Sequence, residues 1–264
     1  MGWVIAFRIV SFACITLASV VPVLAQFDNS GVGPAPVRAP PPPSCDAPGT
    51  PREKAFATPR LKRLLSKGTD VRIAAYGTSA TQGTGASSQE NSYPLQLQAI
   101  LRRNLKHAHI NVDNMGVPGE IAAETAVRIL TELASDPPGF LIWQTGVNDG
   151  VNDVAVTRFE TSMRSTIDAA RRTGVELLIV GQHYTSRLAD NPHYNAIGRA
   201  MERIAREKGV ALVDRFAAMR AIVTARGKED MLADDNFHLN DYGYRCMAEQ
   251  IGKSVIEGLR AGSS

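Results

Sequence analysis

The sequence predicts an α/β fold in which a mostly parallel, five-stranded sheet lies between two layers of helices. From Leu61 onward, short apolar runs of the β type alternate with longer amphipathic segments. Strands that alternate with helices indicate right-handed βαβ units. A parallel sheet of this kind is covered on both faces, so its strands should be apolar along most of their length.

The elements of this sheet can be assigned in chain order. Five short apolar segments are predicted to be strands: 71–76, 110–114, 140–144, 177–181 and 210–213. Five longer segments are predicted to be helices: 92–106, 120–134, 155–173, 193–208 and 240–261. Ligand sites in such sheets lie beyond the carboxyl ends of the strands. Functional side chains are therefore expected just after each strand.

The first 25 residues are typical of a signal peptide. Arg8 is the only charged residue before Asp28, residues 9–24 are almost entirely apolar, and Val23-Leu24-Ala25 offers a cleavage site after Ala25. An uncleaved membrane anchor is the alternative, because about 20 apolar residues are enough to span a bilayer. Cleavage predicts a periplasmic or secreted protein with no stable membrane insertion.

Residues 26–60 are rich in Pro, Gly, Ala and Ser and are predicted to be a spacer. Residues 61–264 are predicted to form one domain with one core. Cys45 and Cys246 form an even pair once Cys14 leaves with the signal peptide, and export favours a disulfide between them. Two unpaired buried thiols are the alternative.

The composition places the chain among ordinary globular proteins. It is 44% hydrophobic and 21% charged, and its formal net charge is +3. Such a balance gives no case for nucleic acid as a partner. The oligomeric state is left open by the sequence.

Polar residues and glycines follow the predicted strands at four places. Ser79 follows the first strand, Gly119 the second and Asn148 the third. Asp235 and His238 stand three residues apart after the fifth strand and just before a helix. Each of these positions taken alone is more typical of a turn or a structural loop than of a catalytic site. Together they supply every role that ester hydrolysis by serine requires.

These roles follow from the chemistry of a hydroxyl nucleophile. Ser79 is a weak nucleophile until a base, here His238, takes its proton. Asp235 can orient the imidazole, and backbone N–H groups or an amide such as that of Asn148 can stabilise the oxyanion. His183 follows the fourth strand and is a further candidate for the cleft, whereas Trp143 lies within a strand and is expected in the core.

The same segments resemble the conserved blocks of the SGNH hydrolases, also called GDSL esterases and lipases. The matching segments are Gly77-Thr78-Ser79, Asn114 through Gly119, Gly146-Val147-Asn148-Asp149 and Asp235 through His238, in the family's order over about residues 70–260. The resemblance implies a three-layer α/β/α sandwich of the SGNH or flavodoxin-like kind. It also implies a Ser79–His238–Asp235 triad, an oxyanion hole of Ser79, Gly119 and Asn148, and no cofactor or metal. One departure is Thr78, where the family usually has Asp.

The sequence therefore predicts a serine esterase that acts on a small-molecule or glycan ester. Export favours O-acetyl groups on carbohydrate or other cell-envelope material. Acyl transfer, or hydrolysis of lysophospholipids or thioesters, would use the same triad. A non-catalytic carbohydrate-binding protein on the same fold is the alternative outside the enzymes.

Overall fold

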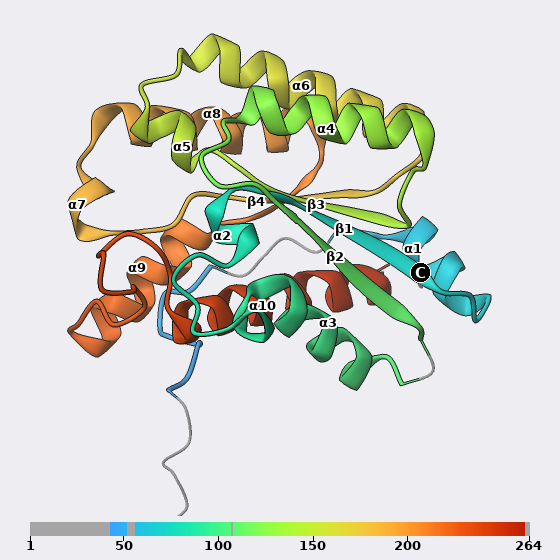
Figure 1. The fold of residues 1–264 in the computed structure, drawn as a ribbon, viewed down its shortest axis with the longest axis horizontal. Helices are drawn as coiled ribbons and strands as arrows, with labels where there is room; N and C mark the ends of the chain where they lie inside the picture. Colours follow the sequence, from blue (N-terminus) through green and yellow to red (C-terminus); the bar gives the residue numbers. More distant parts are fainter. Residues whose placement is uncertain (1–42, 52–55, 107, 262–264) are drawn as a thin grey trace, which may run out of the picture. The chain divides into compact units, whose positions relative to one another are not determined.

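The five predicted strands form one parallel sheet, described here from a computed structural model that covers residues 43–51, 56–106 and 108–261 (Figure 1). The strand order is β2-β1-β3-β4-β5, and every neighbouring pair is parallel. The strands are β1 (Val71–Gly77), β2 (Ile110–Gly116), β3 (Phe140–Gln144), β4 (Leu177–Val180) and β5 (Ala211–Val213). The predicted α/β fold is confirmed, and each strand begins and ends within two residues of its predicted bounds.

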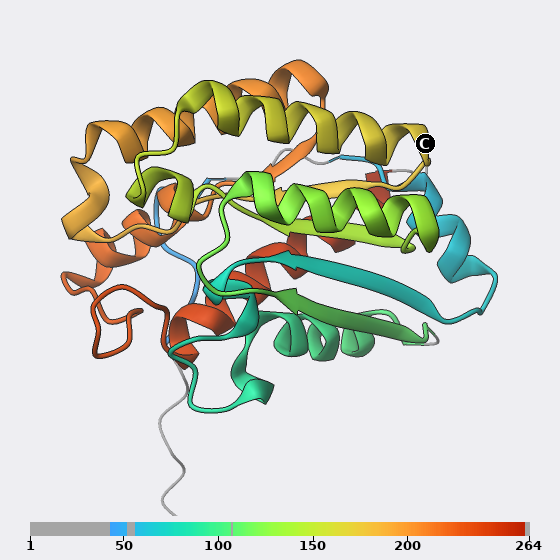
Figure 2. The same cartoon turned by 45° about the horizontal axis from the view of Figure 1, so that its top comes forward.

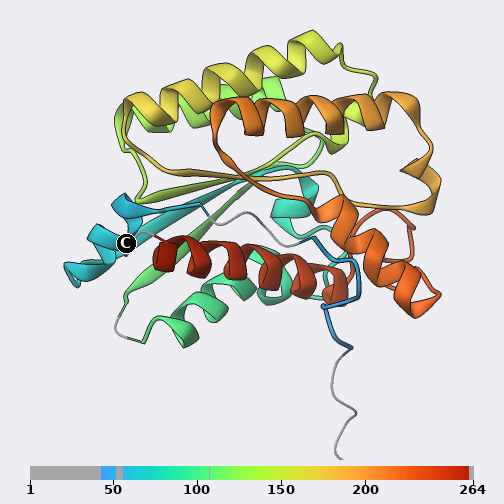
Figure 3. The same ribbon diagram turned by 180° about the vertical axis from the view of Figure 1, so that it is seen from behind.

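Helices cover both faces of the sheet. One layer contains α4 (Ala122–Ser135), α6 (Val156–Arg172) and α8 (Pro192–Lys208). The other contains α1 (Pro59–Ser66), α3 (Tyr93–Asn104), α9 (Arg215–Arg226) and α10 (Asp241–Ala261). The view from behind shows α6 and α8 on one side of the strands and α9 and α10 on the other (Figure 3). Short helices follow three of the strands: α2 (Ser79–Gln82) after β1, α5 (Val147–Val151) after β3 and α7 (Ser186–Ala189) after β4, and the 3₁₀ turn η1 (Gln89–Asn91) lies between α2 and α3.

The twisted sheet, seen obliquely in Figure 2, separates two apolar layers. Alternate residues of a strand point to opposite faces. In β3, Ile142 packs in the layer of α3 and α10, whereas Trp143 packs in the layer of α4, α6 and α8. Both side chains are fully buried, so Trp143 lies in the core as predicted.

The helices α1 and α9, and the short helices α2, α5 and α7, were not predicted from the sequence. The buried face of α9 carries Arg215 beside Met219 and Ile222, so a charged side chain interrupts the apolar stripe that marks a helix. The Asp214 side chain accepts a hydrogen bond from the Ala217 N–H at 3.0 Å and caps this helix. Helix α1 begins at Pro59, inside the segment 26–60 that was predicted to be a spacer because it is rich in Pro.

Residues 43–51 and 56–58, within the range assigned to the spacer, are described as part of the same compact unit as the sheet. The ring of Phe56 stacks on Phe140 with centroids 6.4 Å apart, and Thr58 is fully buried. The predicted signal peptide and residues 26–42 lie outside the described residues. In the part of the chain that is described, no helix is long and apolar enough to cross a membrane.

Cys45 and Cys246 form the predicted disulfide. Both residues are buried in the layer that contains α3 and α10. The bond joins the segment before α1 to the first turns of α10, across a sequence separation of 201 residues. A cross-link that closes so long a loop removes much conformational entropy from the unfolded chain.

We therefore expect reduction of the Cys45–Cys246 disulfide to destabilise the fold by about 2–5 kcal/mol. Denaturant unfolding with and without a thiol reductant measures this loss. A double variant, Cys45→Ser with Cys246→Ser, is the control and should unfold at the same denaturant concentration in both conditions. Equal stability of the oxidised wild type and its fully reduced form would contradict the expectation.

Candidate active site

The side chain of Ser79 lies at the carboxyl end of the central strand β1. Strand β1 ends at Gly77, Thr78 is extended, and Ser79 is the first residue of α2. Only 9% of Ser79 is exposed. The sharp change from strand to helix turns the hydroxyl out of the sheet toward the loops that follow the other strands.

A buried side chain of β3, Gln144, holds this turn. Its Oε1 accepts hydrogen bonds from the Thr78 N–H and the Thr78 hydroxyl, both at 3.0 Å, and from the Thr81 hydroxyl at 3.2 Å. The side chain of Thr78 thus donates to the neighbouring strand at the position where the related family usually carries Asp. Sequence reasoning did not identify Gln144, because nothing in its own segment shows that β3 lies beside β1.

The two glycines that end β1 and β2 let α2 lie close to the sheet. Gly77 and Gly116 are register partners. A β-carbon at Gly77 would lie 2.1 Å from Thr81 Oγ1, and one at Gly116 would lie 2.1 Å from the backbone nitrogen of Gln82. Any larger residue at either position would push the turn that carries Ser79 away from the sheet.

His238 connects Ser79 to Asp235 through hydrogen bonds at both ring nitrogens. Its Nε2 lies 3.0 Å from Ser79 Oγ, and its Nδ1 lies 2.5 Å from Asp235 Oδ2. A carboxylate only accepts, so Nδ1 carries the proton and Nε2 is free to accept the proton of Ser79. The structure thus brings together the three residues predicted as the triad, which stand 159 and 3 positions apart along the chain.

The loop that carries Asp235 and His238 is closed by its own backbone. Leu232 and Leu239 form an antiparallel bridge, and the Ala233 N–H donates to the carbonyl of His238 at 2.8 Å. Asn236 adopts a φ of 54°, a conformation that Asn tolerates better than most residues. These contacts fix the backbone of His238 independently of its side chain.

The hydrogen bonds to Asp235 favour its charged form. Its Oδ1 accepts from the backbone N–H groups of Phe237 at 3.0 Å and His238 at 2.9 Å. Partial burial alone would raise the pKa of Asp235, but the bonds from the His238 side chain and from these two N–H groups outweigh it and lower the pKa below its ordinary value. Asp235 therefore remains an anion beside the imidazole at neutral pH.

Three donors that were predicted for the oxyanion hole lie at the ends of β1, β2 and β3. None of the described residues accepts a hydrogen bond from the backbone N–H of Ser79 or Gly119. Gly119 has a φ of +84°, which favours glycine. The Asn148 amide donates one proton to the carbonyl of Glu120 at 2.8 Å, and its second proton is available to a ligand.

An ion pair braces the loop that carries Gly119. Arg128 donates to both carboxylate oxygens of Glu120, at 2.8 and 2.6 Å, and to the carbonyl of Met115 at 3.0 Å. The Thr125 hydroxyl donates to the same carboxylate at 2.8 Å. The Glu120 side chain is only 13% exposed. A bidentate pair of this kind fixes geometry, and here it fixes the residue next to Gly119.

A second network fixes the loop that follows α2. Asp241, at the start of α10, accepts from the Ser87 N–H at 2.8 Å, from the Ser87 hydroxyl at 2.6 Å and from the Asn91 amide at 3.0 Å. The Tyr244 hydroxyl donates to the carbonyl of Thr84 at 2.6 Å. The start of α10 thus holds this loop beside the loop of His238.

His183 does not line a cleft. It is 3% exposed, and its Nδ1 lies 3.4 Å from Nη2 of the buried Arg215. Burial, together with the nearby charge of Arg215, holds the pKa of His183 well below its ordinary value. His183 is therefore a neutral, buried side chain beneath the loop of Asp235 and His238.

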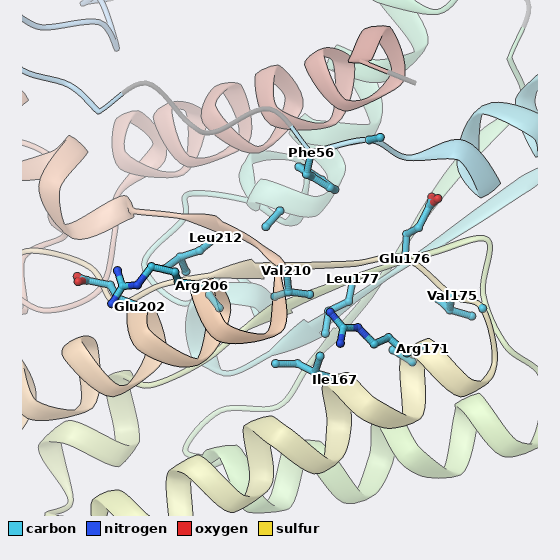
Figure 4. A pocket seen from close by; sticks show the side chains of 16 residues that line it. Phe56, Ile167, Arg171, Val175, Glu176, Leu177, Glu202, Arg206, Val210 and Leu212 are labelled. Carbon is cyan, nitrogen blue, oxygen red and sulfur yellow. The ribbon is translucent and has the colours of Figure 1, made fainter. Parts of the chain in front are cut away.

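A cavity of about 810 Å³ lies at the other end of the sheet, where β4 and β5 begin. Figure 4 shows Ile167, Leu177 and Val210 gathered in it, with Arg171 among its charged residues. The triad residues follow the carboxyl ends of strands, so this cavity is separate from them. Among the described residues, no group of three or more His, Cys, Asp or Glu side chains could hold a metal ion.

A family model described as the non-GDSL lipase-like family matches residues 44–261. The chain belongs to this family. The predicted resemblance to SGNH-type hydrolases is thereby confirmed, and the family's description agrees with Thr78 in place of the usual Asp. Esterase TesA of Pseudomonas aeruginosa is 25% identical over 128 residues, which are 48% of this chain and 60% of that protein. The chain thus spans three fifths of the length of this curated relative.

Solved structures of esterases share the fold. A two-domain esterase active on acetylated mannans, co-crystallised with mannopentaose, matches with a TM-score of 0.64 and 22% identity, over 80% of this chain and 56% of that chain. A variant of Axe2, an acetyl xylan esterase from Geobacillus stearothermophilus, matches with a TM-score of 0.62 and 19% identity, over 71% and 95%. At these identities the likeness shows a common fold.

A buried carboxyl next to Asn148 makes the stability of this fold depend on pH. Both oxygens of Asp149 accept from the Ala122 N–H at 3.1 Å, at the start of α4. Burial raises the pKa of Asp149 from its ordinary value of 3.8 to about 6, against the lowering effect of backbone hydrogen bonds. The folded chain therefore binds this proton more tightly than the unfolded chain.

The stabilisation from this proton is full below pH ~4 and is lost as the pH rises through about 6, a loss of at most about 3 kcal/mol. Asp149→Asn keeps an acceptor for Ala122 but does not titrate. We expect its free energy of unfolding, measured in denaturant from pH 4 to pH 7, to fall less than that of the wild type. The exposed neighbour Asp153, changed to Asn, is the control. Parallel pH curves for Asp149→Asn and the wild type would refute the assignment.

Proposed function

We propose that this protein is a serine esterase that hydrolyses carboxylic esters, with Ser79 as nucleophile, His238 as general base and Asp235 as its orienting partner. The observation that carries the proposal is the continuous hydrogen-bonded chain from Ser79 Oγ through both nitrogens of His238 to Asp235. Membership of a lipase-like family and the esterases among its relatives support it. A protein that only binds carbohydrate would have no need of this proton path.

In the proposed reaction, Ser79 Oγ attacks the ester carbonyl carbon while its proton passes to Nε2 of His238. The carbonyl oxygen becomes an oxyanion and accepts from the N–H groups of Ser79 and Gly119 and from the second amide proton of Asn148. The carbon–oxygen bond to the alcohol then breaks, and His238 protonates the departing alcohol. Water repeats the sequence on the acyl-serine, releases the acid and restores Ser79.

Asp235 acts through His238 in this scheme. Its anionic form, favoured by three hydrogen bonds, stabilises the imidazolium that exists between the two proton transfers. The brace of Glu120 and Arg128 keeps the Gly119 N–H and the Asn148 amide in place before the charge develops. Donors that need not move during the reaction are the ones that lower the barrier most.

The proposed substrates are O-acetyl groups on carbohydrate outside the cytoplasm. Two structural neighbours act on acetylated mannan and acetylated xylan. The disulfide between Cys45 and Cys246 supports an oxidising compartment, which fits the predicted signal peptide cleaved after Ala25. Release of acetate from acetylated mannan and xylan oligosaccharides, compared with p-nitrophenyl esters of increasing acyl length, tests this choice. Faster turnover of long-chain esters or thioesters than of acetyl esters would contradict it.

We expect Ser79→Ala to abolish ester hydrolysis while the protein remains folded, because no other hydroxyl contacts Nε2 of His238 in the described chain. Hydrolysis of p-nitrophenyl acetate and circular dichroism measure activity and fold. A fluorophosphonate probe should label Ser79 in the wild type. Ser87, whose hydroxyl donates to Asp241, serves as the comparison, and labelling at Ser87 instead would sink the assignment.

Asp235→Asn should lower turnover strongly at neutral pH. The new Asn can still accept from the backbone, but its amide would donate to Nδ1 of His238 and favour the wrong tautomer. Loss of such an aspartate costs about 10⁴-fold in a serine protease. We expect a smaller loss, because the bond from the Ala233 N–H to the His238 carbonyl still holds the loop.

The adjacent Asp234 provides the matched control for Asp235. Asp234 is exposed, and it contacts the loop through its carbonyl, which accepts from the Asn236 amide at 3.3 Å. Asp234→Asn should therefore leave turnover nearly unchanged. Steady-state rates of both variants decide the point, and a greater loss from Asp234→Asn would show that the orienting carboxylate is misassigned.

A further inference from the structure

A fully buried arginine lies behind the proposed triad. Arg215, the first residue of α9, is 1% exposed. Its Nη1 donates to the sulfur of Met247 at 3.0 Å, and its Nη2 lies 3.4 Å from Nδ1 of His183. Its Nε has no hydrogen-bond partner among the described residues, and none of their carboxylates forms an ion pair with it.

Other arginines of this chain contrast with Arg215. Arg72, Arg128 and Arg203 are partly exposed and each pairs with a glutamate. A buried charge without an oppositely charged partner is destabilising, and replacing it by an apolar side chain of similar size is often neutral or stabilising. A charged side chain at such a position points to a role other than stability.

The ring of His183 lies beside the other terminal nitrogen of Arg215. Arginine only donates, so Nδ1 of His183 accepts and its proton resides on Nε2. The guanidinium therefore selects one neutral tautomer of His183. The Tyr194 hydroxyl, which donates to the His183 carbonyl at 2.7 Å, fixes the backbone of the same residue. His183 is thus held in one orientation and in one protonation state.

The ring of Phe237 lies between His183 and His238 and contacts both. The rings of His183 and Phe237 meet edge to face, with centroids 5.1 Å apart and an angle of 74°. The rings of Phe237 and His238 do the same at 5.0 Å and 84°. Contacts therefore run without interruption from the buried guanidinium to the imidazole that lies 3.0 Å from Ser79 Oγ.

We propose that Arg215 is a positioning residue that, through His183 and Phe237, holds the imidazole of His238 in line with Ser79. A donor is needed rather than an apolar side chain, because without the guanidinium the buried Nδ1 of His183 would lose the donor beside it and the ring could turn away from Phe237. This proposal rests on the proposed esterase function.

The test is Arg215→Met, which removes the charge but keeps an unbranched chain beside Met247. We expect kcat for p-nitrophenyl acetate to fall about 10- to 100-fold, as misplacement of a catalytic group does. KM should stay within about twofold, because Arg215 does not contact the substrate. The Tm should be unchanged or higher, because a buried charge has been removed. A merely structural residue would instead lower Tm together with activity.

Two further variants complete the experiment. Arg215→Lys keeps a donor and the charge, and should recover part of the lost kcat. Arg220→Met makes the same change on the same helix, where an exposed arginine lies over the ring of Phe216, and should leave kcat unchanged. Fluorophosphonate labelling of Ser79 gives the fraction of competent molecules in each preparation.

The proposal is overturned if Arg215→Met keeps kcat within twofold of the wild type. It is also overturned if the variant unfolds, or if its loss of kcat is matched by an equal loss of labelled Ser79 and a lower Tm. Failure of the wild type itself to label at Ser79 would overturn the esterase function and this proposal together. A labelled, active wild type with an unaffected Met variant would overturn this proposal alone.

Discussion

The site depends on the parallel pairing of β1 with β2 on one side and β3 on the other. This pairing places the carboxyl ends of three strands side by side, and a nucleophile, a glycine loop and an amide follow them in turn. The three hydrogen bonds accepted by Gln144 then join the end of β3 to the turn after β1. Neither strand end can shift along the sheet without breaking these buried hydrogen bonds. Leaving their donors and acceptors without partners costs more free energy inside a protein than in water.

The sheet positions only part of the site, and the loop before α10 carries Asp235 and His238. Asp235 and His238 belong to a loop whose position is set by the helix that follows it, which also binds the loop after α2 through Asp241. The distance between Ser79 and His238 is thus set by two loops that converge on the start of one helix. Cys246, near the same end of α10, adds a covalent bond to this region.

The strands could be predicted from the sequence because a strand buried on both faces is a short apolar run, whatever its neighbours are. Ser79, Asp235 and His238 could be proposed because a parallel sheet brings its strand ends together, and their roles stay predictions. Gln144 and Arg215 could not be found in this way. The contacts of Gln144 depend on the order of the strands in the sheet. Arginine is a residue type that usually lies on the surface, whereas Arg215 is fully buried.

The disulfide turns most of the chain into a closed ring. Every residue proposed to act on the ester, from Ser79 to His238, lies between Cys45 and Cys246. A protease that cuts one surface loop inside this ring opens it but releases no fragment, so nucleophile and base stay in one covalent molecule. Such a nicked chain would separate into pieces only after reduction. The bond therefore confers resistance to fragmentation in addition to its effect on the unfolded state.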